Sequence, residues 1–164
     1  MTARASGAGY RWANPARLLP DDLPGLLGGA DVVVVRILGG YRAWPEGIDR
    51  VLGSGVPAVL VSGEQSPDAD LTARSTVPAG IAVQAHVYLA QGGVANLRNL
   101  HAFLCDTLLM TGLGFSPPED IPGWGLLDRV AADGGGPTIA VLYYRAQQLA
   151  GNTTYVEELC RAIE

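Results

Sequence analysis

The polar residues that follow the apolar segment 56–61 are the first candidates for chemistry in this chain. They combine carboxylates, which accept hydrogen bonds, with a guanidinium and hydroxyls, which donate them. Such a set could hold the edge of a ligand that carries carboxylates and amides, with the arginine as the partner of an anion. A solvated loop held by its own turn hydrogen bonds is the alternative interpretation. The residues are Glu64, Asp68, Asp70, Arg74, Ser75 and Thr76.

Arg36 is a further candidate because it lies inside an apolar run of valine, isoleucine and leucine. An unpaired charge buried there would be costly. We therefore expect Arg36 either to pair with a carboxylate or to point into the crevice above a sheet. A structural ion pair is the simpler interpretation, since structural networks imitate functional sites.

A second loop with candidate binding groups follows Tyr144. It leads from an expected strand to the start of an expected helix, where free N–H groups and the helix dipole favour anions. Ordinary helix capping would use the same residues. The candidates in this loop are Arg145, Asn152 and Thr153.

His101 and Cys105 are four residues apart on one expected helix, with Asp106 adjacent. That spacing suits a transition metal, but one helix face supplies only two ligands, and His86 is not placed by the sequence to join them. Packing in or near the core is the preferred interpretation. We assign no metal ligand and no catalytic residue, since no Ser/His/Asp arrangement or zinc motif is present.

Two valine-rich segments predict the parallel sheet that would position these residues. Val32 to Val35 and Val56 to Val61 contain no polar residue, so we expect buried strands covered on both faces. The Gly39-Gly40 pair ends the first strand, and Pro45 marks the start of a helix. Ligands of such sheets usually bind at the loops after the strands.

Periodicity and glycine breaks predict the remaining elements of the first region. A short helix follows Asp21-Asp22 and stops at Gly28-Gly29, and a second helix carries its apolar residues on one face and ends at Gly53. A long polar loop is expected through Pro78. The second helix covers 44–52, and the other expected elements are a short strand and loop within 10–18 and helices over 81–91 and 94–111.

A stretch dense in glycine and proline, residues 112–137, is typical of a linker. The apolar segment 138–144 predicts another buried strand, and Thr154-x-x-Glu157 is a capping-box pattern for a final helix. The expected organisation is an N-terminal α/β domain (1–113), a linker (114–137), and the first strand and helix of a second α/β domain (138–164). A lone strand and helix cannot bury both strand faces, so we interpret the chain as a piece of a longer protein.

Composition excludes several functions. The net charge is −5, and no basic cluster exists, which argues against nucleic acid as a partner. All 11 basic residues are arginine, which excludes a lysine-containing phosphate loop and Schiff-base chemistry. No apolar run is long enough to cross a membrane and no secretion signal is present, so the cytoplasm is the expected compartment. Cys105 and Cys160 are interpreted as buried thiols.

Four segments in collinear order carry a family resemblance. Val-Val-Val-Arg-Ile-Leu-Gly-Gly-Tyr-Arg-Ala-Trp-Pro-Glu-Gly at 33–47 resembles the N-terminal region of the large subunit of aerobic cobaltochelatase (CobN), a relative of the porphyrin-binding H subunit of magnesium chelatase. The other three segments are 63–78, with Ser-Thr-Val-Pro at its end, 96–107, with Asn-Leu-Arg-Asn-Leu at its start, and 144–153, with Tyr-Arg-Ala and Gly-Asn-Thr.

The resemblance implies a flavodoxin- or Rossmann-like fold lacking its first strand, and a role in cobalamin biosynthesis. The large subunit of that family binds hydrogenobyrinic acid a,c-diamide and receives Co(II), while two AAA+ type partner subunits hydrolyse ATP. This chain would bind no cofactor itself and would act as an inactive scaffold. The family usually has a histidine where Gln147 stands, so that residue's role does not carry over. The alternatives are a piece of a magnesium-chelatase subunit, a stand-alone small-ligand module, or a subunit-docking module.

Overall fold

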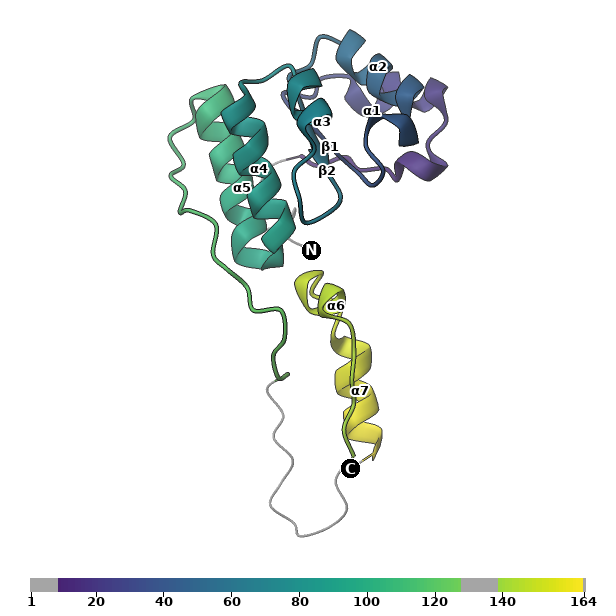
Figure 1. Cartoon of the computed structure of the whole chain (residues 1–164), viewed down its shortest axis with the longest axis vertical. Helices are drawn as coiled ribbons and strands as arrows, with labels where there is room; N and C mark the ends of the chain where they lie inside the picture. The colour runs from purple at the N-terminus through teal and green to yellow at the C-terminus, as the bar shows by residue number, and fades with distance from the viewer. Residues whose placement is uncertain (1–8, 128–138, 164) are drawn as a thin grey trace.

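The computed structural model describes residues 9–127 and 139–163. Within these residues, two parallel strands lie between helices, and a helical hairpin is the largest unit (Figure 1). The expected α/β class is confirmed. In chain order, the elements are η2 (Pro15–Arg17), η3 (Pro20–Asp22), α1 (Leu23–Leu27), β1 (Val33–Ile37), η4 (Tyr41–Ala43), α2 (Pro45–Gly53), β2 (Ala58–Ser62), α3 (Ala69–Arg74), α4 (Ala79–Gln91), α5 (Gly93–Leu109), α6 (Arg145–Leu149) and α7 (Thr154–Ile163).

The two valine-rich segments form the sheet, as the sequence predicts. β1 and β2 pair in parallel, with Val33 opposite Ala58 and Ile37 opposite Ser62. The glycine turn after β1 uses positive φ angles, 83° at Gly39 and 70° at Gly40, which side chains with a Cβ rarely adopt. Pro45 then occupies the first position of α2, where its missing N–H costs nothing.

Two apolar clusters cover the two faces of this sheet. On one face, Val35, Ile37 and Leu60 pack with residues of α1, α2 and α3. On the other face, Val59 and Val61 pack with α4 and α5. The molecule is therefore layered as helices, sheet, helices, which is how a parallel strand pair is normally buried.

The two strands differ in burial, which corrects the expectation that both are covered on both faces. All residues of β2 are buried, whereas Val34 of β1 is 38% exposed and Arg36 is also exposed. The cause is the position of α4, which packs against β2. In this two-stranded sheet, α4 lies over β2, and among the described residues the side chains of Val34 and Arg36 on β1 are left exposed.

Two local predictions before residue 78 are wrong. The expected polar loop contains helix α3, whose first turn is capped by Asp68 accepting from the N–H of Leu71 at 3.0 Å. A helix of six residues is too short to show periodicity in the sequence. The segment 10–18 contains no strand; the 3-10 turn η2 lies there, with Asn14 accepting from the N–H of Ala16.

The hairpin of α4 and α5 matches the expected helices and their glycine break. Gly92 and Gly93 both have positive φ, 69° and 82°, and Met110, which caps the C-terminus of α5, is in the left-handed region. Neither helix is long and apolar enough to cross a membrane, nor is any other helix in the described residues.

The expected linker begins as a strap that is fixed to the hairpin. After α5 the chain turns back along that helix (Figure 1). Asn96 anchors it at both groups of its side-chain amide, donating to the carbonyl of Glu119 and accepting from the N–H of Glu119. Tyr88 donates to the carbonyl of Ser116, and the side chain of Asn99 accepts from the N–H of Ser116. Residues 113–122 are called the strap below.

The C-terminal part differs from the expected strand and helix. Residues 139–144 form no strand, and Ile139, Leu142 and Tyr144 are exposed. A strand needs a neighbour for its backbone groups, and no strand lies beside this segment in the described residues. The short helix α6 was not predicted. Helix α7 was predicted. The residue that precedes its first turn and bonds to Glu157 is Thr153, however, and not Thr154.

Candidate functional site

An open cleft of about 550 Å³ lies between the glycine turn after β1 and helix α3. This is the carboxyl end of the edge strand, where ligands of parallel sheets usually bind. Three of the polar residues proposed from the sequence line it, together with residues that the sequence did not single out. The lining residues are Gly39, Gly40, Tyr41, Arg42, Asp68, Asp70 and Arg74.

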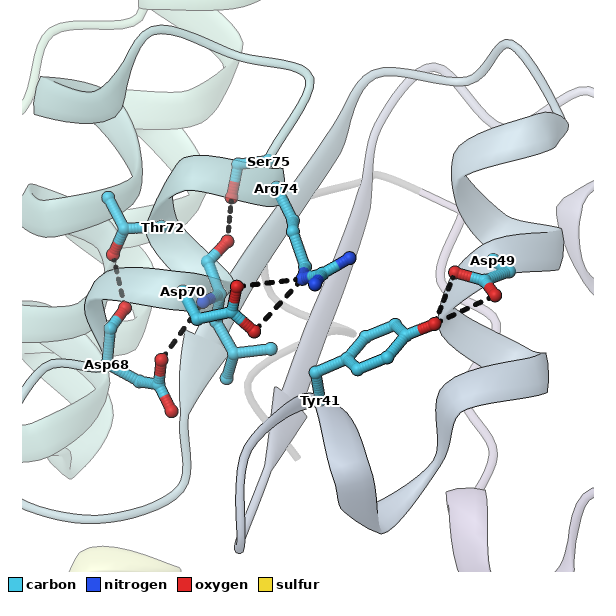
Figure 2. Close-up of polar contacts among 8 residues, drawn as sticks. Tyr41, Asp49, Asp68, Asp70, Thr72, Arg74 and Ser75 are labelled. Atoms are coloured by element: carbon cyan, nitrogen blue, oxygen red, sulfur yellow. Dashed lines mark hydrogen bonds and ion pairs between the residues drawn. The ribbon is translucent and has the colours of Figure 1, made fainter.

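Arg74 is held rigidly in the wall of this cleft (Figure 2). Its Nε donates to both carboxylate oxygens of Asp70 at 3.0 Å, and its guanidinium lies 3.9 Å from the ring centre of Tyr41. Tyr41 is itself fixed, since its hydroxyl donates to both carboxylate oxygens of Asp49 at 3.0 and 2.9 Å. The ion pair with Asp70 raises the pKa of Arg74, and the bond to Asp49 raises the pKa of Tyr41.

This network joins α2, through Asp49, to α3, through Asp70 and Arg74. It also means that Asp70 already balances the charge of Arg74. Arg74 can therefore shape the wall of the cleft and offer its Nη atoms, but its net attraction for a second anion is reduced.

Arg42 is the cation that the sequence reasoning missed. It is exposed at the cleft, and no residue in the described part of the chain pairs with it. Its position in the turn directly after Gly39-Gly40 is the signal that could have identified it. The turn fits tightly against α3, because a Cβ on Gly40 would lie 2.8 Å from Oδ2 of Asp68. Gly40 and Asp68 thus set the spacing between Arg42 and α3.

Ser75 and Thr76 lie outside the cleft and hydrogen-bond to the sheet. The hydroxyl of Thr76 accepts from the N–H of Ala58 at 2.7 Å, and the hydroxyl of Ser75 accepts from the N–H of Leu60 at 2.9 Å. The N–H of Thr76 also donates to the carbonyl of Ala58. The two residues thereby bond the edge of β2 that faces away from β1.

Arg36 and Glu64 lie at the carboxyl ends of the strands but do not meet as an ion pair. Nη2 of Arg36 donates to the carbonyl of Gly63 at 3.2 Å, and partial burial lowers the pKa of Arg36. Glu64 is exposed, and its backbone carbonyl contacts Nε2 of His86 at 3.1 Å. In the described residues, the contact of Arg36 is thus with the backbone and not with a carboxylate.

The second candidate loop does not join the cleft. Arg145 donates to the carbonyls of Ile121 at 2.7 Å and Pro122 at 2.8 Å, which fixes the end of the strap to α6. Asn152 donates to the side chain of Gln147, and Thr153 donates to Glu157. These groups are used in capping and tethering, and they do not converge on a shared space.

His101 and Cys105 lie together on α5, with Sγ of Cys105 3.7 Å from Nε2 of His101. The other ring nitrogen of His101 is 2.5 Å from the hydroxyl of Tyr10. Asp106 turns away to the end of the helix, where bonds from Thr111 and Leu113 lower its pKa. No group of three or more histidine, cysteine or acidic residues suited to a metal is found among the described residues, and both cysteines are free thiols.

The family described as CobN/Magnesium Chelatase matches residues 86–164. A solved structure, the catalytic subunit of cobaltochelatase from Mycobacterium tuberculosis, is 69% identical over 99% of the chain, with a TM-score of 0.84. The chain is similar to the CobN/magnesium chelatase family over nearly its whole length. A curated relative, the aerobic cobaltochelatase subunit CobN of Pseudomonas aeruginosa, is 27% identical over 186 aligned positions covering 92% of the chain.

The chain spans only part of these CobN relatives: 14% of the Mycobacterium tuberculosis subunit and 15% of the Pseudomonas aeruginosa one. The matched family region starts within α4 and includes the strap, α6 and α7. The cleft precedes that region, but it falls inside the stretch aligned with the solved CobN structure, which covers nearly all of this chain. The resemblance found in the sequence is thus confirmed.

Proposed function

We propose that this chain serves in the large, tetrapyrrole-binding subunit of an ATP-dependent cobaltochelatase. The reaction is the insertion of Co(II) into hydrogenobyrinic acid a,c-diamide during aerobic cobalamin biosynthesis in the cytoplasm, with AAA+ type partner subunits hydrolysing ATP. The observation that carries this proposal is the 69% identity to a cobaltochelatase catalytic subunit over 99% of the chain.

Within that function, the proposed role of residues 9–127 and 139–163 is a scaffold. Metal insertion requires bases that accept two pyrrole protons inside an enclosed cavity. The two carboxylates of the cleft are already engaged: Asp68 caps α3, and Asp70 binds Arg74. The cleft is also open to solvent and is not an enclosed cavity. The described residues therefore supply a surface for contact more readily than a catalytic centre.

An insertion assay tests the scaffold role. We expect this chain, mixed with the two ATPase partner subunits, Co(II), ATP and hydrogenobyrinic acid a,c-diamide, to incorporate no cobalt above the uncatalysed rate. The full-length Mycobacterium tuberculosis catalytic subunit with the same partners is the positive control. Cobalt incorporation by the 164-residue chain above the uncatalysed rate would contradict the proposal.

We further propose that the cleft holds a carboxylate or amide at the edge of the tetrapyrrole, with Arg42 as the partner of the anion. Two observations favour Arg42 over Arg74, which the sequence suggested. Asp70 neutralises Arg74, whereas Arg42 is exposed and has no partner among the described residues. A charge-assisted hydrogen bond to a carboxylate contributes about 1.5–3 kcal/mol.

The role of Arg42 can be measured by titrating hydrogenobyrinic acid a,c-diamide into the isotope-labelled chain. We expect amide shifts at Gly39, Gly40 and Arg42, and a Kd raised roughly tenfold or more in the Arg42→Gln variant, since about 1.4 kcal/mol corresponds to a factor of ten. Arg17→Gln, an exposed arginine on η2, is the matched control and should leave Kd unchanged. Shifts confined to other regions, or an unchanged Kd for Arg42→Gln, would remove the cleft from the proposal.

A further inference from the structure

Asp68 presents an oxygen to the cleft that its capping role leaves unused. Its Oδ1 accepts the N–H of Leu71 in the first turn of α3 at 3.0 Å. Its Oδ2 is directed away from that bond and toward the glycine turn, where a Cβ built on Gly40 would lie 2.8 Å from it (Figure 2). Within residues 9–127 and 139–163, Oδ2 of Asp68 has no hydrogen-bond partner. The cap holds the carboxylate in place, so Oδ2 is a positioned acceptor.

Arg42 supplies a donor on the other side of the same cleft. It follows Gly40 by two positions in η4 and is exposed, and none of the described residues pairs with it. The second acid–base pair of the cleft is already closed, because Nε of Arg74 donates to both oxygens of Asp70. What the cleft leaves for a ligand is therefore one guanidinium and one carboxylate oxygen.

The charges of the cleft favour a neutral ligand group. The lining contains two carboxylates, Asp68 and Asp70, and two guanidiniums, Arg42 and Arg74, so their formal charges cancel. A ligand carboxylate would bring a third negative charge close to Asp68 and Asp70, and an ammonium would lie close to two cations. A primary carboxamide avoids both penalties, because it carries two N–H donors and a carbonyl acceptor without a net charge.

We propose that the cleft binds a primary carboxamide in preference to a carboxylate. Oδ2 of Asp68 accepts from the NH2 of the amide, and the guanidinium of Arg42 donates to its carbonyl oxygen. This inference rests on the proposed function for its physiological ligand, which is then one of the two amides of hydrogenobyrinic acid a,c-diamide. Arg42 would strengthen binding of an amide and of an acid alike, whereas Asp68 is the residue that distinguishes them.

Asp68→Asn reverses the chemistry at this position without removing the helix cap. Asparagine is as good a capping residue as aspartate. Its one carbonyl oxygen is required by the N–H of Leu71, so its NH2 group takes the place of Oδ2. The acceptor for the ligand thereby becomes a donor, which suits a carboxylate and opposes the NH2 of an amide. A partly unfolded variant would lose both ligands and could not produce such a reversal.

The measurement is the Kd of the isotope-labelled chain for two ligands, hydrogenobyrinic acid a,c-diamide and the same macrocycle with both amides replaced by carboxylates. We expect the wild type to bind the diamide roughly tenfold more tightly, the effect of one hydrogen bond to a charged group. In Asp68→Asn we expect this preference to vanish or reverse, with a lower Kd for the acid. Asp31→Asn removes the same charge at an exposed position before β1 and should keep the wild-type preference.

The inference and the proposed function can fail separately. Equal Kd values in the wild type, or the same preference in Asp68→Asn, would show that Asp68 only caps α3, even if the macrocycle binds in the cleft. If neither macrocycle shifts the amides of Gly40 and Arg42, the tetrapyrrole role of the cleft fails, and propionamide and propionate then decide the inference. Shifts at these amides with propionamide alone, lost in Asp68→Asn, would support it, and equal responses to the two compounds would overturn it.

Discussion

Replacing Ser75 by alanine and Thr76 by valine together is expected to lower the free energy of unfolding by roughly 2–6 kcal/mol. Each replacement leaves one buried N–H without an acceptor, and each such N–H costs about 1–3 kcal/mol. The donors are the N–H groups of Ala58 and Leu60, both 0% exposed in the centre of the fold. Because small domains are stable by only about 5–15 kcal/mol, a loss of this size could unfold the chain at moderate temperature.

Urea unfolding followed by circular dichroism measures this effect. Thr76→Ser keeps the hydroxyl and should lose much less stability than Thr76→Val, which keeps the shape but not the acceptor. Ser66→Ala, at an exposed serine in the turn before α3, is the control for a serine without this role. A double variant within about 0.5 kcal/mol of the wild type, the range usual for neutral surface changes, would show that β2 does not depend on these hydroxyls.

Asn96→Ala is expected to free the strap from the hairpin and to cost about 2–4 kcal/mol, from two lost hydrogen bonds and a small cavity. Asn96 is 0% exposed, and its amide bonds the N–H of Glu119 at 2.8 Å and the carbonyl of Glu119 at 2.9 Å. Both bonds are made to the backbone of the same strap residue, Glu119.

Hydrogen exchange provides the local measurement for Asn96→Ala. The amides of Ser116, Glu119 and Ile121 should exchange faster, while those of β2 should change little. Asn99→Ala is the matched comparison: within the strap Asn99 bonds only the N–H of Ser116, its Nδ2 donates to Ala95 inside α5, and it is partly exposed, so only the amide of Ser116 should exchange faster. If exchange in the strap is the same in Asn96→Ala and the wild type, other contacts of the strap, such as those of Tyr88 and Arg145, are sufficient.

The strap links the two ends of the described chain. Its start is tied to α4 and α5, and its end is tied through Arg145 to α6. The family region, residues 86–164, contains all of these contacts. The glycine and proline content that predicts a linker therefore coexists with a defined path, because side-chain amides of the hairpin satisfy the backbone of the strap in place of a regular element.

The sequence predicted the elements whose signals lie within a short stretch of the chain. β-branched residues identify the two strands, and apolar periodicity identifies α2, α4, α5 and α7. It missed α3, which has only six residues. It also predicted a strand over 138–144, because a run of apolar residues indicates a preference for strands but cannot show whether a partner strand is present.

The candidate site was predicted in part. Asp68, Asp70 and Arg74 do line the cleft, because they lie along a short helix next to the carboxyl end of a strand. Ser75 and Thr76 were grouped with them, since a hydroxyl that binds a ligand and one that bonds a sheet edge look the same in a sequence. Arg42 was overlooked although it directly follows the Gly39-Gly40 turn, because the sequence does not show that this turn lies against α3.

By itself, the sequence determined the family, the α/β class, the parallel strand pair and the glycine turn that follows it. The tertiary structure decided which charges are already balanced and which edge of the sheet is bonded by side chains. The physical reason is how far apart in the chain the interacting residues lie. Propensity and periodicity act between residues close in the chain, whereas the bonds of Thr76 to Ala58, Asn96 to Glu119 and Tyr41 to Asp49 exist only after the elements have packed.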